Sequence, residues 1–166
     1  MLEVLEQDHG AAEVQPVLDA LAERRLRLAI AEGDTGGLLL AWLTAVPGSS
    51  AVVLGGVVAY HDDLKRQLLG VDAELLLRQG AVSAGAAEAM ASGVRRLVGA
   101  DLGLATTGIA GPGGATPSKP VGLAFVAAVG AERVLVREHR WPGEREDNRR
   151  ASAQAALRLT LELLQP

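Results

Sequence analysis

The chain has 166 residues, 49% of them hydrophobic, which is enough for one domain with its own core and too few for two comfortable ones. A net charge of -4, with only two Trp, one Tyr and one Phe, argues against a nucleic-acid partner, because such binding needs basic side chains and aromatic stacking. Cysteine is absent, which excludes disulfides and thiol catalysis and fits a reducing compartment.

The first ten residues, MLEVLEQDHG, are acidic where a signal peptide would be basic. No uninterrupted apolar run approaches the roughly 18 residues that a membrane-spanning helix needs. We therefore expect a cytoplasmic protein with no membrane contact. The expected organisation is a single domain over residues 1–166, with an N-terminal helix at about 11–25 and a core at about 26–166.

Apolar residues recur at spacings of three and four along six segments, and this period predicts helices. The predicted helices lie at residues 11–25, 38–46, 64–69, 73–78, 84–98 and 144–164. Short apolar runs bounded by turn residues predict strands. The predicted strands lie at residues 26–31, 51–60, 102–107, 121–129 and 133–140. The second of these contains Gly55 and Gly56, which indicates a buried strand approached closely by another backbone.

Helices and strands alternate along most of the chain, so the economical fold is a three-layer α/β/α domain with a mixed sheet. In the turn EGDTGG, Asp34 or Thr35 is expected to cap the helix that follows, and Ser83 is expected to cap the helix at 84–98. Small residues on that helix suit either a contact between two copies of the chain or packing on the sheet.

The segment TGIAGPGGATPSKP, residues 107–120, contains the most informative pattern. A connection of this length inside a compact domain is usually functional or disordered, and the prolines argue against disorder. The glycines allow close backbone approach, so the loop is predicted to cradle an anion or polar ligand with its amide groups. Their spacing fits neither GxxxxGK[ST] nor GxGxxG. A rigid connection without a ligand is the alternative.

Four segments together resemble the C-terminal domain of the CinA (competence/damage-inducible) family. They are the glycine loop, the turn AEGDTGG, the run LTAVPGSSAVVLGGVVAYHDDLKRQLLGV and the later GAVSAGAAEAMASGVRRL. The resemblance runs from about Leu26 to the last helix. It implies a three-layer α/β/α fold with a mixed, mostly parallel five-stranded sheet. It also implies kinship with amidases that hydrolyse the carboxamide of nicotinamide mononucleotide without a metal or other cofactor.

The resemblance assigns roles within the turn. The family turn reads A-E-S-x-T-G-G, with the serine as nucleophile, and this sequence has Gly33 at that position. Asp34 stands where the family usually has an apolar residue or cysteine. The rest of the turn is kept, and the resemblance implies ligand binding by Glu32, Asp34, Thr35, Gly36 and Gly37.

Outside the turn, Tyr60 and Lys65 match the catalytic tyrosine and lysine of the family. By default, however, Lys65 would be a solvated charge and Tyr60 the end of a strand. Arg145 and Arg149 both fall where the family has a phosphate-contacting arginine, and the sequence does not choose between them. The remaining implied ligand-binding residues are Ser49, Ser50, Thr107, Gly108, Gly111, Gly113 and Gly114.

Glycine cannot supply the nucleophile that acyl transfer through a covalent intermediate requires. The sequence therefore predicts a protein that binds a pyridine mononucleotide, with amidase activity lost or strongly impaired. The alternative is an active amidohydrolase that uses a water activated by Asp34 or Lys65, or another hydroxyl such as that of Thr35, Ser49 or Ser50. The histidines are scattered without a carboxylate cluster, so no metal is expected.

Overall fold

The computed structural model describes residues 11–165; the acidic start of the chain lies outside them. The helices are α1 (Ala11–Arg24), α2 (Leu38–Ala45), α3 (Asp62–Leu69), α4 (Ala73–Gln79), α5 (Ala84–Val98) and α6 (Arg145–Leu163), with a short 3-10 helix at Ser49–Ala51. The strands are β1 (Leu28–Glu32), β2 (Val53–Val58), β3 (Leu102–Gly108), β4 (Leu123–Val129) and β5 (Val134–Arg140). Every element predicted from the sequence is present, within a few residues of its expected bounds.

The five strands form one sheet in the order β2-β1-β3-β4-β5. β1 pairs parallel with both β2 and β3, whereas β3 with β4 and β4 with β5 pair antiparallel. The sheet is mixed as expected, but "mostly parallel" overstates it, because the parallel and antiparallel pairings are equal in number. The antiparallel half follows from the hairpin between β4 and β5, whose short connection cannot cross over the sheet.

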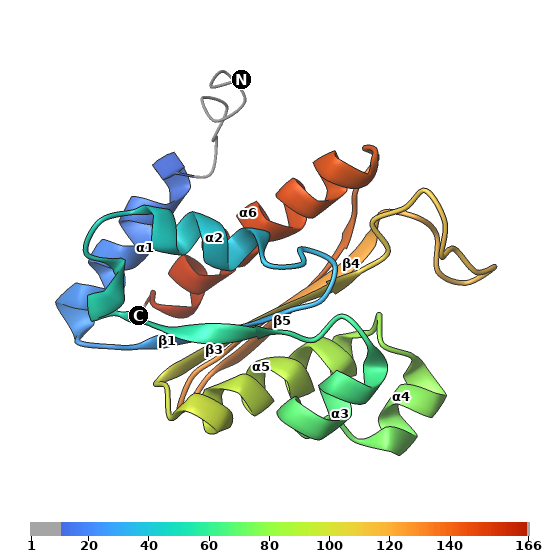
Figure 1. The fold of residues 1–166 in the computed structure, drawn as a ribbon, viewed down its shortest axis with the longest axis horizontal. Helices are drawn as coiled ribbons and strands as arrows, with labels where there is room; N and C mark the ends of the chain where they lie inside the picture. Colours follow the sequence, from blue (N-terminus) through green and yellow to red (C-terminus); the bar gives the residue numbers. More distant parts are fainter. Residues whose placement is uncertain (1–10, 166) are drawn as a thin grey trace.

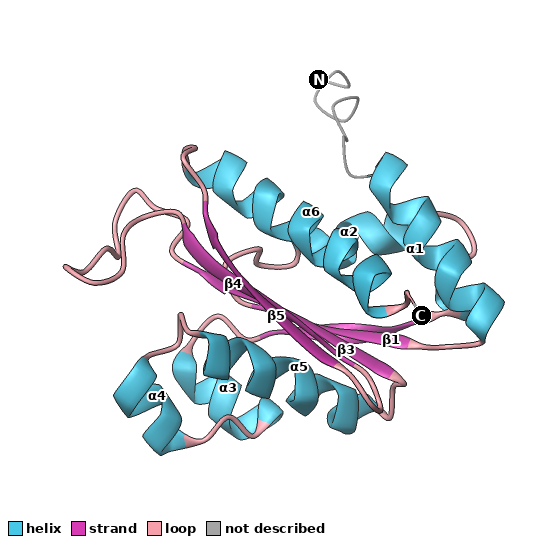
Figure 2. Ribbon diagram, turned by 180° about the vertical axis from the view of Figure 1, so that it is seen from behind, coloured by secondary structure: helices cyan, strands magenta, loops and turns pink. Residues whose placement is uncertain are grey.

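Helices cover both faces of the sheet. α1, α2 and α6 lie on one face, and α3, α4 and α5 lie on the other (Figures 1 and 2). Side chains alternate across β1. Leu28 and Ile30 join the hydrophobic core on the side of α1, α2 and α6, whereas Ala29 and Ala31 join the core on the side of α3 and α5. The described helices include none that is long and apolar enough to cross a membrane.

β2 forms one edge of the sheet, and this corrects the expectation of a fully buried strand. Leu54 and Val58 are 40% and 42% exposed, because β2 has a neighbour on one side only. The expected close backbone approach is confirmed at Gly56, where a Cβ would lie 2.5 Å from the Ile30 carbonyl oxygen of β1.

The amino ends of α5 and α2 are capped in different ways. The Ser83 hydroxyl accepts a bond from the Ala86 amide at the start of α5, as the sequence predicted. At α2, in contrast, the expected cap by Asp34 or Thr35 is wrong, because the N-cap residue is Gly37 and no cap side chain bonds to the helix. The amides of Gly37, Leu39 and Leu40 donate instead to the Glu32 carboxylate, at 2.9, 3.1 and 2.9 Å.

The small residues of α5 are used within the fold. Its buried residues are Ala86, Ala87, Met90, Ala91, Gly93 and Val94. Ala87, Met90, Ala91 and Val94 belong to the core beneath β1, β3 and β4. The expected packing of these small residues on the sheet is therefore confirmed.

Candidate functional site

A hollow of about 170 Å³ lies where β1 and β3 end. Its lining comes from the turns after β1, β2 and β3, from the start of α3, from the turn before α5 and from the start of α6. The lining residues are Gly33, Asp34, Tyr60, Asp62, Lys65, Ala81, Val82, Thr107, Gly108, Ala110 and Arg145. The carboxyl ends of neighbouring parallel strands are the usual ligand position in open α/β sheets, so this hollow is the candidate functional site.

Gly33 sits at the end of β1 and is held tightly against β3. Its amide donates to the Thr106 carbonyl oxygen at 2.9 Å. A Cβ at this position would lie 2.9 Å from that oxygen and 3.3 Å from the Thr107 Cα. A side chain here therefore requires a small displacement of the backbone of β1 or β3.

Lys65 is buried, with 3% of its surface exposed, and is not the solvated charge that its place on a helix suggested. Its Nζ donates to the Tyr60 carbonyl oxygen at 3.3 Å and to Asp62 Oδ1 at 3.1 Å. Asp62 therefore neutralises the ammonium group at the edge of the hollow. Sequence analysis missed Asp62, although its spacing of three residues from Lys65 on one helix was a usable signal.

Arg145, the first residue of α6, joins two sides of the hollow. Its Nη2 donates to the Tyr60 hydroxyl at 3.0 Å, and its Nη1 donates to the Gly111 carbonyl oxygen at 2.7 Å. Tyr60 is 62% exposed, and this bond fixes its ring at the rim. Arg145 also lines a neighbouring cavity of about 470 Å³, together with Ala110, Gly111, Pro112, Val121, Gly143 and Glu144.

Arg149, one turn further along α6, does not line the hollow. Its Nε and Nη2 donate to the carbonyl oxygens of Asp34 and Thr35, at 3.3 and 2.7 Å, and its Nη1 pairs with Glu146. The structure thus separates the two arginines that the sequence left undecided. Arg145 faces the hollow, and Arg149 clamps the turn behind it.

Glu32 and Thr35 are occupied by the fold itself. Glu32 is 1% exposed, and it receives the Thr35 hydroxyl at 2.6 Å in addition to the three amides at the start of α2. Thr35 Oγ1 also lies 2.8 Å from Thr106 Oγ1, which ties the turn to β3. Glu32 and Thr35 therefore shape the turn, as Gly36 and Gly37 do, and none of these four residues lines the hollow.

Asp34 does line the hollow, and its carboxyl group is buried. Burial raises the pKa of Asp34 above its usual 3.8. The hydroxyls of Ser152 and Thr106 and the Asp34 backbone lower this pKa in part, while the charge of Glu32 raises it further. A buried carboxyl with a raised pKa beside a hollow can hold a proton or take one up.

The structure brings only part of the glycine loop to the hollow. Thr107 and Gly108 line it, and the Thr107 hydroxyl donates to the Ala81 carbonyl oxygen at 2.8 Å. Gly111 lines the neighbouring cavity. Gly113 and Gly114 are exposed, and the loop between β3 and β4 extends away from the sheet, as its gold segment shows in Figure 1.

Ser49 and Ser50 lie elsewhere. They form the 3-10 helix before β2 and line a separate cavity of about 430 Å³, together with Val53 and Leu54. β2 runs parallel to β1 from Val53 to Val58, so the serines are at the amino end of the strand and the hollow is at its carboxyl end. The structure therefore does not bring them together with Gly33.

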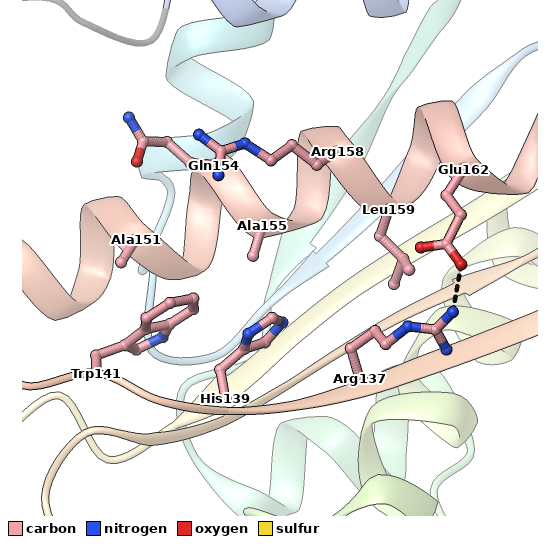
Figure 3. Close-up of a pocket in the computed structure, with 9 residues that line it drawn as sticks. All are labelled: Arg137, His139, Trp141, Ala151, Gln154, Ala155, Arg158, Leu159 and Glu162. Carbon is pink, nitrogen blue, oxygen red and sulfur yellow. Dashed lines mark hydrogen bonds and ion pairs between the residues drawn. The ribbon is translucent and has the colours of Figure 1, made fainter.

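Another cavity, of about 380 Å³, lies between β5 and α6 (Figure 3). His139 and Trp141 stack in its wall with ring centroids 4.5 Å apart. Its charged groups have partners, because Arg137 pairs with Glu162 and Arg158 pairs with Glu13. Over residues 11–165, no three His, Asp or Glu side chains are grouped so that they could hold a metal ion.

Both the sequence and the fold of this chain match a known family. The family model described as CinA C-terminal domain matches residues 11–164. The chain belongs to this family. A CinA-like protein of Mycolicibacterium gilvum is 50% identical over 153 residues, which cover 92% of this chain and 36% of that relative. This CinA-family chain spans about a third of the length of the curated relatives it matches.

Solved CinA-family structures share the fold. The competence/damage inducible protein CihA from Agrobacterium tumefaciens superposes with a TM-score of 0.91 at 39% identity, covering 94% of this chain and 96% of that one. A CinA superfamily protein from Klebsiella pneumoniae gives a TM-score of 0.91 at 32% identity, with coverages of 95% and 98%. The predicted family and the predicted α/β fold are therefore confirmed.

The Glu32 network of this CinA-family domain predicts a large stability effect. Glu32→Gln replaces one acceptor oxygen with an amide donor that would face backbone amides. We expect it to lower the free energy of unfolding by about 1–3 kcal/mol or more, as for other buried donors left without an acceptor. Urea unfolding measures this change. The matched variant Glu138→Gln, in an exposed pair with Arg140, should cost about 0–1 kcal/mol, and equal losses in the two variants would contradict the structural role of Glu32.

The raised pKa of Asp34 predicts a pH-dependent stability. The folded state holds this proton more tightly than the unfolded state, so its contribution to stability is complete below pH 3.8 and is lost as the pH rises through the raised folded-state pKa. Asp34→Asn cannot ionise. Unfolding experiments from about pH 4 to 8 should therefore show the variant gaining stability relative to wild type as the pH rises. A difference independent of pH would contradict the raised pKa.

Proposed function

We propose that this protein binds a pyridine mononucleotide and that its amidase activity is lost or strongly impaired. One observation carries the proposal: Gly33, at the position that the family resemblance gives to the nucleophile, lines a hollow that still contains Lys65, Tyr60 and Thr107. The surroundings of the reaction are retained while the attacking oxygen is absent. Removal of a nucleophile typically costs on the order of 10⁶ in rate.

The lining supports binding of a phosphorylated ligand. Arg145 presents a guanidinium group between the hollow and the neighbouring cavity, and guanidinium pairs with phosphate in a two-pronged geometry. At about 170 Å³ the hollow is smaller than the roughly 300–1,000 Å³ of most ligand sites. We infer that the ring and its carboxamide occupy the hollow and that the phosphate lies at Arg145, toward the larger cavity. The absence of cysteine fits action in the cytoplasm.

One observation favours the alternative, an amidohydrolase that activates a water directly. Asp34 is a buried carboxyl in the wall of the same hollow and could accept the proton of a water. General base help alone contributes roughly 10² to 10⁴ in rate. Other hydroxyls have little support, because the hydroxyl of Thr35 is bonded to Glu32 and that of Thr107 to Ala81.

Restoring the hydroxyl tests the proposal. Gly33→Ser should raise ammonia release from nicotinamide mononucleotide by about 10² or more over wild type, because it returns the missing nucleophile. Gly33→Ala is the matched control: it adds the same Cβ against Thr106 without the oxygen. Both variants should lose about 1–3 kcal/mol of stability through this crowding, and only the serine variant should release ammonia faster.

Two results would contradict this account. Wild-type turnover near the common enzyme value of about 10 s⁻¹ would show that the reaction does not need a nucleophilic side chain at position 33. Equal ammonia release by the serine and alanine variants, both folded, would show that the hollow no longer presents an amide to residue 33.

The role of Arg145 can be tested by calorimetry. Arg145→Gln should weaken binding of nicotinamide mononucleotide about tenfold or more, because a charge-assisted bond to phosphate is lost. Binding of nicotinamide riboside, which has no phosphate, should change little. Arg140→Gln removes an equal charge from exposed β5 and should leave both affinities unchanged. An equal loss for both ligands in the Arg145 variant would exclude a phosphate contact.

A further inference from the structure

One oxygen of Asp34 has no partner. Among buried side-chain atoms of the described residues, Asp34 Oδ1 and Glu13 Oε2 alone lack a hydrogen bond. The Asp34 side chain is in the wall of the hollow, with 7% of the residue exposed. Buried polar atoms are nearly always paired, so a carboxyl group with an unpaired oxygen next to a hollow is a candidate contact for a ligand that enters the hollow.

The position of the Asp34 carboxyl depends on the glycine next to it. A Cβ at Gly108 would lie 2.7 Å from Asp34 Oδ2. Gly108 lines the same hollow. Any other residue at position 108 would displace the Asp34 carboxyl. The position of this carboxyl beside the hollow therefore depends on the glycine at the end of β3.

The cations nearest the Asp34 carboxyl have other partners: Arg145, which lines the same hollow, bonds to the Tyr60 hydroxyl and the Gly111 carbonyl oxygen and is assigned to the phosphate of the ligand. From β1, the neighbouring Glu32 is also acidic, and its oxygens are used by α2. From α6, Arg149 donates to the backbone of Asp34 and to Glu146. From α3, Lys65 is paired with Asp62. The remaining neighbours are the hydroxyls of Ser152 on α6 and Thr106 on β3, which carry no charge.

The part of the hollow beside Asp34 and Gly108 therefore favours a neutral polar group over an anion. When protonated, the carboxyl donates one bond and accepts another; when ionised, it only accepts. A carboxamide provides both an N–H donor and a carbonyl acceptor, and therefore pairs with Asp34 in either state. A carboxylate only accepts, so it pairs with Asp34 only when Asp34 is protonated, and beside ionised Asp34 and Glu32 its buried charge is costly.

We propose that Asp34 is the specificity-determining residue of the hollow and that it selects ligands with a carboxamide over the corresponding carboxylates. This inference rests on the proposed function, because it assigns the carboxamide end of the mononucleotide to the part of the hollow beside Asp34. It names the form of the nucleotide that the protein binds: the amide, and not the acid that amide hydrolysis yields.

Calorimetry with two ligands tests the assignment. Wild type should bind nicotinamide mononucleotide at least about tenfold more tightly than nicotinate mononucleotide. Asp34→Asn keeps the shape and can pair with either group, so it should reduce this ratio to about threefold or less, mainly by gaining affinity for the acid. Asp63→Asn removes an equal charge from an exposed position on α3 and should keep the wild-type ratio. Asp34→Cys, the residue type often present in the family, provides a second variant if the asparagine variant does not fold.

The outcomes are distinguishable. Equal affinities of wild type for the two mononucleotides, or a ratio unchanged in a folded Asp34 variant, would overturn the role of Asp34 and leave the proposed function standing. No heat with either ligand at millimolar concentration would overturn both. A ratio that falls equally in the Asp63 variant would assign the selectivity to overall charge and overturn the inference.

Discussion

The bonds from the start of α2 to the Glu32 carboxylate determine the geometry of the rest of the site. Glu32 is the last residue of β1, and it accepts bonds from the amide of the N-cap residue Gly37 and from two amides of α2. The turn between them can therefore adopt only a narrow set of conformations, and Gly33 and Asp34 lie inside it. Arg149 holds the same turn from α6 through two carbonyl oxygens. A helix N-terminus is a natural anion site, and here a side chain of the protein fills it.

In this arrangement, the residues that hold the turn are different from the residues that line the hollow. The turn is stabilised by Glu32, Thr35 and Arg149, none of which lines the hollow. Gly33 and Asp34 contribute to the lining but are not needed for these bonds. Substitutions of the side chains at positions 33 and 34 would therefore leave these bonds in place.

The sequence predicted the elements well, because apolar period and turn residues are local signals. It also placed Lys65, Tyr60 and Thr107 together through the family motifs. The predictions that were wrong concerned contacts between residues that the local sequence pattern does not specify. The cap of α2 comes from a residue before the turn, and the burial of Lys65 depends on its pairing with Asp62. Ser49 and Ser50 belong to a family motif, but the parallel direction of β2 puts them at the other end of the sheet. Arg145 and Arg149 differ by one helical turn, which only the structure resolves.

The two bonds of Arg145 link the hollow to the outer surface of the molecule. The same guanidinium holds the Tyr60 hydroxyl and the Gly111 carbonyl oxygen, and buried Gly111 directly precedes the exposed part of the loop between β3 and β4. An anion that arrives at Arg145 competes with both contacts. If that competition displaced the bond to Gly111, ligand binding and the conformation of the loop would be thermodynamically linked. Arg145 therefore connects the lining of the hollow to the base of the projecting loop, because the same side chain contacts both.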